Sequence, residues 1–343
     1  MDVLLVLVGF FLLVKGADLF VDSAVVVARR AGVSQYVIGV SLVAFATSLP
    51  EMAVSSIASL TGVGGIAVGN VIGSNVANVC LAIGLPLFFY PILPGSRTRF
   101  DTLLLLSATG ALWLFLYTGR VLGRVEGGVF FVSYILFLVL VYRRKDVDRS
   151  EELEGEGPGG GKGSSERSER PSPERESARV DKGESGKNGK KSGKKKPVAF
   201  YVALTLFFGL VVVFGADLLV RGAIGVSYAF GVSDLFIGST VVALGTSLPE
   251  ITTSVVAGIK KKHGITVGNV IGSNLMNILA VLGFASLLRP IPVPWSVVYI
   301  FVPYALVVSA FPLLTPAREP MRRYFAPVLI AGYVFFVYLL VVF

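Results

Sequence analysis

Residues 47–51 of the chain read TSLPE, and residues 246–250 read TSLPE again. Each copy is followed by the heptapeptide GNVIGSN, which occupies residues 69–75 and then residues 268–274. The two motifs recur at one constant offset, because 246 minus 47 and 268 minus 69 are both 199. A constant offset across two separate motifs indicates a tandem duplication of the chain.

The duplicated segment is long and apolar. Residues 9–85 superimpose on residues 208–284 without insertion or deletion. The whole chain is 54% hydrophobic and 15% charged, with a mean hydropathy of +0.75, whereas about 25% of the residues of a soluble domain are charged. Many apolar runs reach the ~20 residues needed to cross about 30 Å of hydrocarbon. The composition therefore predicts a membrane protein that crosses the bilayer several times.

The apolar runs predict ten transmembrane helices in two sets of five. The first set covers residues 2–26, 34–60, 66–90, 101–119 and 125–142, and the second covers residues 198–221, 234–259, 265–288, 294–313 and 323–343. We expect a first five-helix repeat at residues 1–142, a linker at residues 143–197 and a second five-helix repeat at residues 198–343. The predicted fold class is an all-α membrane protein.

The predicted linker has no apolar periodicity and is rich in Gly, Ser, Glu, Lys and Arg. Such a segment cannot bury enough apolar surface to offset the entropy of ordering it, so we expect it to be disordered. A flexible tether with a basic end near the lipid headgroups is the simplest interpretation. A regulatory or calcium-sensing role is the alternative.

The distribution of Lys and Arg predicts the orientation in the membrane. The loops after helices 1, 3, 5, 7 and 9 hold most of the basic residues, including the linker, whereas the other loops carry only Arg120, Arg124, Arg221 and Arg289. This predicts a multi-pass protein of the cell membrane with both termini outside and the linker in the cytoplasm. The net charge of +9 then reflects topology, not binding to nucleic acid. Because five is odd, the second repeat enters from the opposite side, and the repeats are inverted.

The repeated motifs place polar groups inside apolar helices. A carboxylate at the centre of a membrane helix costs roughly 2.5 to 3.5 kcal/mol on insertion scales, so Glu51 and Glu250 indicate a functional site. Pro50 removes one helical hydrogen bond, which frees carbonyls near Ala46 and Thr47. Ser48 and Thr47 lie three and four residues before Glu51 and share its face, and Ser247 and Thr246 do the same in the second copy.

The second motif adds hydroxyls and amides. Ser74 and Asn78 are four residues apart, as are Ser273 and Asn277. Together with the glutamates these groups are all oxygen donors, which suits Ca²⁺ or Na⁺ and argues against zinc or copper. A proline kink, a GxxxG spacing or a Ser–Asn bridge taken alone is explained by helix packing, but two glutamates in matching contexts favour an ion site. We expect no cofactor, and the one cysteine, Cys80, excludes a disulfide within the chain.

TSLPE followed by GNVIGSN, present twice, resembles the cation/calcium antiporter superfamily, and within it the prokaryotic sodium/calcium exchanger branch. The resemblance covers both repeats. It implies exchange of Na⁺ for Ca²⁺ by alternating access at a site near the middle of the bilayer, with the lipid bilayer and the two ions as partners and a monomer as the simplest assembly. It also implies that the first and sixth helices slide across the others.

The resemblance implies roles for individual residues. Glu51 and Glu250 would be ligands shared by Ca²⁺ and Na⁺. The other implied ligands are the hydroxyl or backbone oxygens of Thr47, Ser48, Thr246 and Ser247, the carbonyls of Ala46 and Ala243, the hydroxyls of Ser74 and Ser273, and the amides of Asn78 and Asn277. Some relatives carry aspartate at one of the two amide positions. Without it the fixed charge is that of two glutamates, which balances one Ca²⁺ and disfavours co-transport of potassium.

Two other functions remain open. A proton-coupled calcium exchanger would use the same two glutamates as proton carriers. A channel or an ion sensor would not show counterflow, and inverted repeats around buried charge disfavour it. No nucleophile–base constellation is visible, so we do not expect an enzyme.

Overall fold

The computed structural model describes residues 1–30, 48–92, 98–154, 197–259, 263–315 and 319–343. Two of the predicted ligands, Ala46 and Thr47, lie outside the described residues. The chain divides into one unit formed by Met1–Leu138 with Val198–Phe343 and another formed by Val139–Pro197.

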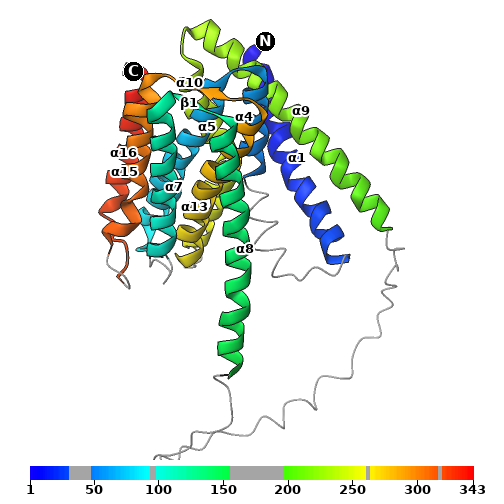
Figure 1. Ribbon diagram of the computed structural model, residues 1–343, viewed down its shortest axis with the longest axis vertical. Coiled ribbons are helices and arrows are strands. Elements are labelled where there is room, and N and C mark those ends of the chain that lie inside the picture. The colour runs from blue at the N-terminus through cyan, green and yellow to red at the C-terminus, as the bar shows by residue number, and fades with distance from the viewer. Residues whose placement is uncertain (31–47, 93–97, 155–196, 260–262, 316–318) are drawn as a thin grey trace, which may run out of the picture. The chain divides into compact units, whose positions relative to one another are not determined.

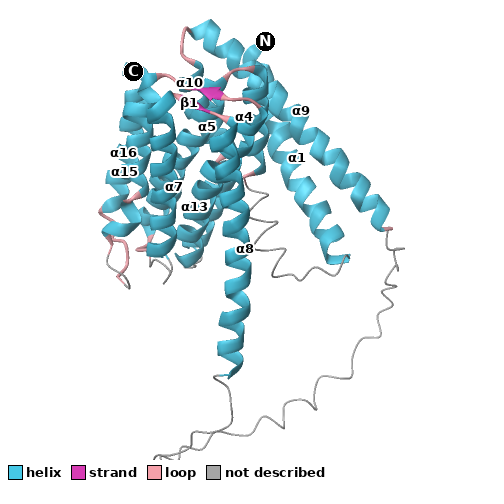
Figure 2. Ribbon diagram, in the orientation of Figure 1, coloured by secondary structure: helices cyan, strands magenta, loops and turns pink. Residues whose placement is uncertain are grey.

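Helices occupy all ten runs predicted from the sequence (Figures 1 and 2). The first repeat contains α1 (Asp2–Arg30), α4 (Leu49–Thr61), α5 (Gly64–Ala77), η2 (Asn78–Ile83), α6 (Gly84–Phe89), α7 (Thr98–Gly119) and α8 (Arg124–Glu154). The second contains α9 (Val198–Phe230), α10 (Asp234–Ile237), η4 (Gly238–Val242), α11 (Ala243–Thr246), α12 (Leu248–Ile259), α13 (His263–Met276), η5 (Asn277–Leu282), α14 (Gly283–Leu288), η6 (Val297–Phe301), α15 (Val302–Ser309), η7 (Phe311–Leu314) and α16 (Phe325–Val342). Of the second predicted run, the described part is α4.

Within the described residues, seven helices are long and apolar enough to cross a membrane, or eight if a bent pair counts as one span. The bent pair is Asp234–Thr246 with Leu248–Val255, whose axes differ by 47°. The break falls at Ser247, just before Pro249, so the predicted interruption by proline is confirmed in this copy. In the first copy Pro50 stands in the first turn of α4, where its missing N–H costs least.

The third helix of each repeat has the same construction. The segments α5, η2 and α6 correspond to α13, η5 and α14 at the offset of 199, since 263 minus 64 and 277 minus 78 both give that number. In both, an α-helix turns into a π-helix at an asparagine, Asn78 in one and Asn277 in the other. Short π-helical segments within α-helices are frequent at functional sites.

Contacts between loops show that the repeats are inverted. Gly64, at the start of α5, lies against Ile291 and Pro292, just past the end of α14. The start of one helix therefore meets the end of its counterpart. Those two residues form β2 (Ile291–Pro292), which pairs antiparallel with β1 (Val121–Leu122). At the other end of the α5–α6 segment, Ile92 bridges to Met321. The fold is an all-α membrane protein built from two inverted repeats.

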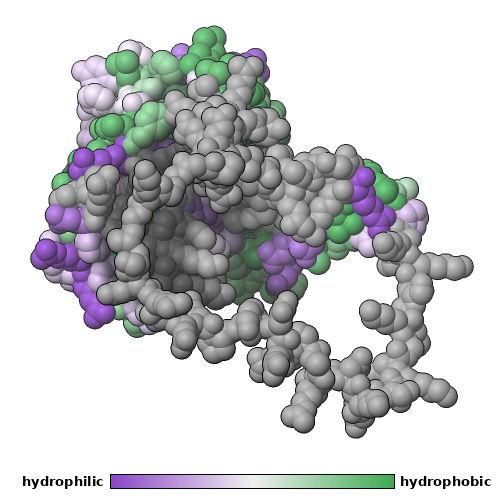
Figure 3. Space-filling model, turned by 90° about the horizontal axis from the view of Figure 1, so that it is seen from below, coloured by the Kyte–Doolittle hydropathy of each residue, from purple (hydrophilic) through white to green (hydrophobic). Residues whose placement is uncertain are grey.

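Burial follows this plan. The segments Gly64–Phe89 and Thr266–Leu288 are the inner spans. In each, 83% of the most apolar 18-residue stretch is buried. The outer helices expose large apolar side chains, such as Phe11 on α1, Leu210 on α9 and Val328 on α16. Figure 3, a view from below, shows green hydrophobic residues over much of the visible coloured surface, with scattered purple hydrophilic residues among them. An apolar outer surface is what hydrocarbon surroundings require.

Two boundaries differ from the prediction by more than a few residues. The helix α9 continues past residue 221 to Phe230, so Arg221 lies within a helix and not in a loop. The helix α8 does not stop at residue 142 but continues to Glu154, inside the predicted linker. The added residues include Arg, Lys and Glu, which favour helix without being apolar, and Gly155 follows them. Hydropathy marks where a helix can lie in lipid, but helix propensity sets how far it continues.

Candidate cation site

The two glutamates predicted from the repeated motif lie at equivalent, buried positions. Glu51 is in the first turn of α4 and is 1% exposed, and Glu250 is in the first turn of α12 and is 0% exposed. The first turn of a helix has backbone N–H groups without helical partners, which favours a negative charge there. Local sequence therefore places both carboxylates directly after a proline, in the first turn of a helix.

Each carboxylate accepts a hydrogen bond from the other repeat. Ser247 Oγ donates to Glu51 Oε1 at 3.3 Å, and Ser48 Oγ donates to Glu250 Oε1 at 3.5 Å. The sequence analysis placed each serine on the face of its own glutamate, three residues along the helix. The structure adds that each hydroxyl reaches the glutamate of the opposite repeat. The two motifs thus form one site and not two.

Two asparagines that the sequence analysis did not select support the glutamate helices. Asn70 Nδ2 donates to the Glu51 carbonyl at 3.3 Å and to Ser55 Oγ at 3.0 Å. Asn269 Nδ2 donates to the Glu250 carbonyl at 3.4 Å and to Ser254 Oγ at 3.2 Å. These contacts join α4 to α5 and α12 to α13. The sequence did carry a signal for these contacts, because Asn70 and Ser55 correspond to Asn269 and Ser254 at the offset of 199.

One hydroxyl from each repeat meets at the backbone carbonyl of Ala243. The oxygen of Ala243 accepts from Ser247 N at 3.0 Å, from Thr246 Oγ1 at 3.4 Å and from Ser74 Oγ at 3.4 Å. Thr246 Oγ1 also lies 3.1 Å from Asn70 Oδ1, to which it donates. The structure therefore brings Ser74, Ala243 and Thr246 together beside Ser247. Ser273 is buried on α13, at 6% exposure.

The predicted amides, Asn78 and Asn277, are buried where the two π-helical segments begin. Each uses its nitrogen: Asn78 Nδ2 donates to Asn274 Oδ1, and Asn277 Nδ2 donates to Asn75 Oδ1, both at 3.0 Å. Their Oδ1 atoms, like Glu51 Oε2, are buried and receive no hydrogen bond from any residue that the structure describes. Buried polar oxygens normally have a partner, so these atoms are suited to a cation.

The predicted ligand atoms are oxygens, and among their groups only the two carboxylates carry a formal charge. Among the described residues, no three His, Cys, Asp or Glu side chains come together. The site instead combines two carboxylates with neutral hydroxyl, amide and carbonyl oxygens. Hard cations such as Ca²⁺ and Na⁺ take ligands of this kind, whereas zinc and copper prefer nitrogen and sulfur.

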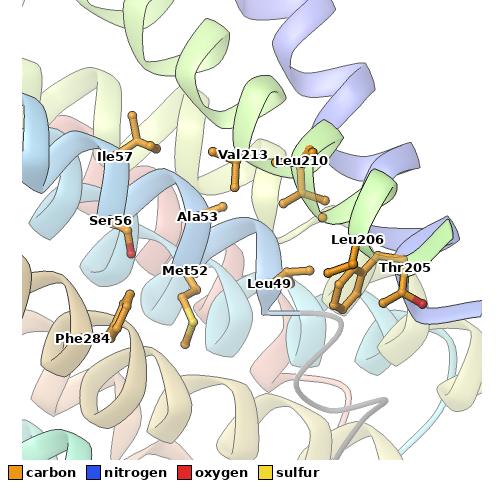
Figure 4. Close-up of a pocket in the computed structure, with 13 residues that line it drawn as sticks. Leu49, Met52, Ala53, Ser56, Ile57, Thr205, Leu206, Leu210, Val213 and Phe284 are labelled. Carbon is orange, nitrogen blue, oxygen red and sulfur yellow. The ribbon is translucent and has the colours of Figure 1, made fainter. Parts of the chain in front are cut away.

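A separate cavity of about 660 Å³ lies on the opposite face of α4, between α4 and α9 (Figure 4). Ala53 and Ile57 of α4 lie on the side of Leu210 and Val213 of α9, whereas Met52 points toward the side of Phe284. Ser56 and Thr205 supply the hydroxyls in its otherwise apolar wall. Cations require oxygen ligands, so this cavity is not part of the cation site. Helix α4 separates the two, with Glu51 on one face and Met52 on the other.

Comparison with known proteins agrees with this geometry. The model of the family described as "Sodium/calcium exchanger protein" matches residues 1–143 and again residues 200–342. The chain belongs to the sodium/calcium exchanger family. The double match follows the two repeats and omits the segment between them.

Curated relatives and solved structures extend the likeness over nearly the whole chain. The chain is 36% identical over 290 residues to the "Putative antiporter CaxA" of Alkalimonas amylolytica, covering 83% of this chain and 80% of the relative. It is 32% identical over 366 residues to the "Sodium/calcium exchanger MaX1" of Methanosarcina acetivorans, covering 98% and 97%. A structure of the sodium–calcium exchanger NCX_Mj soaked with Na⁺ and Sr²⁺ aligns with a TM-score of 0.58 at 28% identity, covering 97% and 96%.

These likenesses confirm the predicted superfamily and its prokaryotic branch. They make the chain a multi-pass membrane antiporter of the cation/calcium type, from a family of transporters. The coupling ion and the individual ligands are matters for the proposal below.

Proposed function

We propose that this protein exchanges Na⁺ for Ca²⁺ across the cell membrane, by alternating access to the site between the two repeats. The observation that carries the proposal is the pair of buried glutamates, each hydrogen-bonded by a serine of the opposite repeat. Two carboxylates buried in one site are unfavourable as a pair of like charges, so the site favours being loaded with cations. One Ca²⁺ balances the two charges.

Coupling follows from shared ligands. Ca²⁺ and Na⁺ are both hard cations that bind carboxylate, hydroxyl and carbonyl oxygens. If both use Glu51 and Glu250, they compete for the site, and one ion has to leave before the other binds. An empty site keeps its charge buried and crosses slowly, which ties the two fluxes together.

We assign the ligands as the resemblance to the family implies. The set comprises Glu51, Glu250, Ser48, Thr47, Thr246, Ser247, Ser74, Ser273, Asn78, Asn277 and the carbonyls of Ala46 and Ala243. The buried amide oxygens of Asn78 and Asn277 support their place in it. The carbonyl of Ala243 already accepts three hydrogen bonds, so it would act after the hydroxyls around it turn away. Both termini are assigned to the outside and the linker to the cytoplasm.

Calcium uptake into proteoliposomes tests the proposal. Vesicles loaded with Na⁺ are diluted into sodium-free medium containing Ca²⁺, and K⁺ or proton gradients are imposed separately. We expect uptake that requires the outward sodium gradient. Equal uptake driven by a proton gradient without any effect of sodium would contradict the proposal and favour a proton-coupled exchanger. Uptake without counterflow of any ion would favour a channel.

A further inference from the structure

Four asparagines form a cluster where α5 meets α13, and the family resemblance assigns a role to only two of them. Asn75 and Asn274 each lie three residues before a predicted ligand, Asn78 or Asn277. All four side chains are at most 4% exposed. Asn75 Nδ2 donates to the backbone carbonyl of Asn274 at 3.2 Å, and Asn274 Nδ2 donates to the backbone carbonyl of Asn75 at 3.0 Å. The inverted repeats thus meet in a reciprocal pair of bonds.

The two backbone carbonyls determine how the amides are oriented. An amide side chain has a donating end and an accepting end, and its orientation is assigned from its hydrogen-bond partners. A carbonyl oxygen only accepts, so the end of Asn75 that faces the Asn274 carbonyl is its NH₂ group. Its other end, Oδ1, accepts from Asn277 Nδ2 at 3.0 Å. The same reasoning, started from the Asn75 carbonyl, orients Asn274 and then Asn78.

The orientation of these amides also determines to which side Asn277 and Asn78 present their oxygens. Because Asn277 uses its nitrogen toward Asn75, its oxygen is presented on the opposite side, and Asn78 is oriented in the same way by Asn274. These two oxygens are the buried atoms that receive no hydrogen bond within the described part of the chain. Turning the Asn277 amide over would place two amide oxygens 3.0 Å apart and leave a buried N–H without an acceptor.

We propose that Asn75 and Asn274 are positioning residues, which hold the amides of Asn277 and Asn78 with their oxygens toward the transported cation. The inference rests on the proposed function for the place of the cation. It deepens that proposal by assigning one positioning residue to each amide, across the interface between repeats. A cation is attracted to an amide oxygen and repelled by an NH₂ group, so loss of the orientation weakens binding.

The test replaces Asn75 by alanine in two backgrounds. In the otherwise native protein, Asn75→Ala should raise the half-saturating Ca²⁺ concentration about tenfold, as loss of a residue that orients a metal ligand commonly does. In an Asn277→Asp background the same substitution should change it by less than about twofold, because a carboxylate presents an oxygen either way round. Equal losses in both backgrounds would show a packing role and overturn the inference.

A crossed control uses the other amide. Asn75→Ala leaves the Asn75 backbone carbonyl in place, so Asn274 and Asn78 keep their orientation. In an Asn78→Asp background, Asn75→Ala should therefore still cost about tenfold. Relief by Asn78→Asp as well as by Asn277→Asp would contradict the one-to-one assignment. If Asn75→Ala does not assemble, Asn75→Ser replaces it, since its hydroxyl is too short to serve both partners.

Binding is read separately from transport, as the rise in Tm of the purified protein with added CaCl₂ or NaCl. Cation binding without sodium-driven exchange would contradict the proposed function and leave this inference standing. A wild-type protein whose Tm responds to neither salt would overturn both. Unchanged cation-induced stabilisation in Asn75→Ala would overturn the inference alone.

Discussion

The two repeats meet along two seams, an inner one and one between α1 and α9, and the two are built in different ways. In the first, formed by α4, α5, α12 and α13, hydrogen bonds cross from one repeat to the other, as between Ser247 and Glu51. In the second, a hydrogen bond crosses from Thr205 Oγ1 to Ser23 Oγ at 3.0 Å, and over the rest of its length glycines bring the two backbones together. A Cβ added to Gly215 would lie 2.7 Å from the backbone nitrogen of Leu13, and one added to Gly9 would lie 2.5 Å from that of Leu219.

Exposure follows the same contrast. In the inner spans Gly64–Phe89 and Thr266–Leu288, 83% of the most apolar 18-residue stretch is buried, whereas the share is 22% in α1, 11% in α9 and 22% in α16. Directional hydrogen bonds specify one geometry, and breaking them inside a membrane is costly. Close contact between glycine backbones has no such direction. We therefore infer that the inner helices hold the ion ligands in place and that α1 and α9 form the part able to slide.

The largest effect we expect tests the inner seam. Glu51→Gln or Glu250→Gln removes one of the two charges that balance Ca²⁺, and the charge of a site strongly affects calcium affinity. Each variant should lower calcium uptake about 100-fold or more, and isothermal titration should show loss of Ca²⁺ binding. Near-native uptake in either variant would remove that glutamate from the site.

The next effect tests the α1–α9 seam. Gly215→Val places carbons against the backbone of α1, and such overpacking typically costs about 1–3 kcal/mol. We expect the maximal rate of uptake to fall about tenfold while the half-saturating Ca²⁺ concentration changes less than about twofold. Gly209→Ala is the matched control, because a Cβ there meets Phe20 at an ordinary 3.5 Å. A change in affinity equal to the change in rate would break the contrast between the two seams.

A smaller effect tests the symmetry of the site. Ser48→Ala and Ser247→Ala each remove one hydroxyl bonded to the glutamate of the other repeat. A hydrogen bond to a charged group contributes about 1.5–3 kcal/mol, and these bonds are long, so we expect about a fivefold loss of Ca²⁺ affinity in each. Kinetics of ⁴⁵Ca²⁺ uptake measure it. Losses that differ more than about tenfold would argue against equivalent roles for the two serines.

The smallest effect tests the far face of α4. Ser56 lines the apolar cavity and lies five residues after Glu51, on the face away from the site. Ser56→Ala should leave the rate and the half-saturating Ca²⁺ concentration within about twofold of the native values, because the buried Ser56 hydroxyl makes no hydrogen bond with any described residue. Ser55→Ala is its partner experiment, because Ser55 accepts from Asn70 and should matter more. An equal effect of both would mean that the cavity also serves transport.

Much of the fold was predictable because hydropathy and repetition are local properties. The ten apolar runs and the proline break at Ser247 follow from residue type along the chain. The π-helical segments that begin at Asn78 and Asn277 could not be predicted in this way, because nothing in the apolar pattern distinguishes them from α-helix. Hydropathy also predicted that the fifth helix ends at residue 142, which was wrong, because α8 continues to Glu154. Helix propensity and hydropathy are separate properties.

The sequence by itself determined that this is a duplicated membrane protein with two glutamates in matching positions, because each of these facts is written in composition, spacing or identity. The tertiary structure alone decided which group meets which. Ser48 reaches Glu250 across 202 positions, and Ser247 reaches Glu51 across 196. Asn75 and Asn274 contact each other's backbone 199 positions apart. Periodicity says which residues share a face of one helix, but only the packing of inverted repeats says what that face touches.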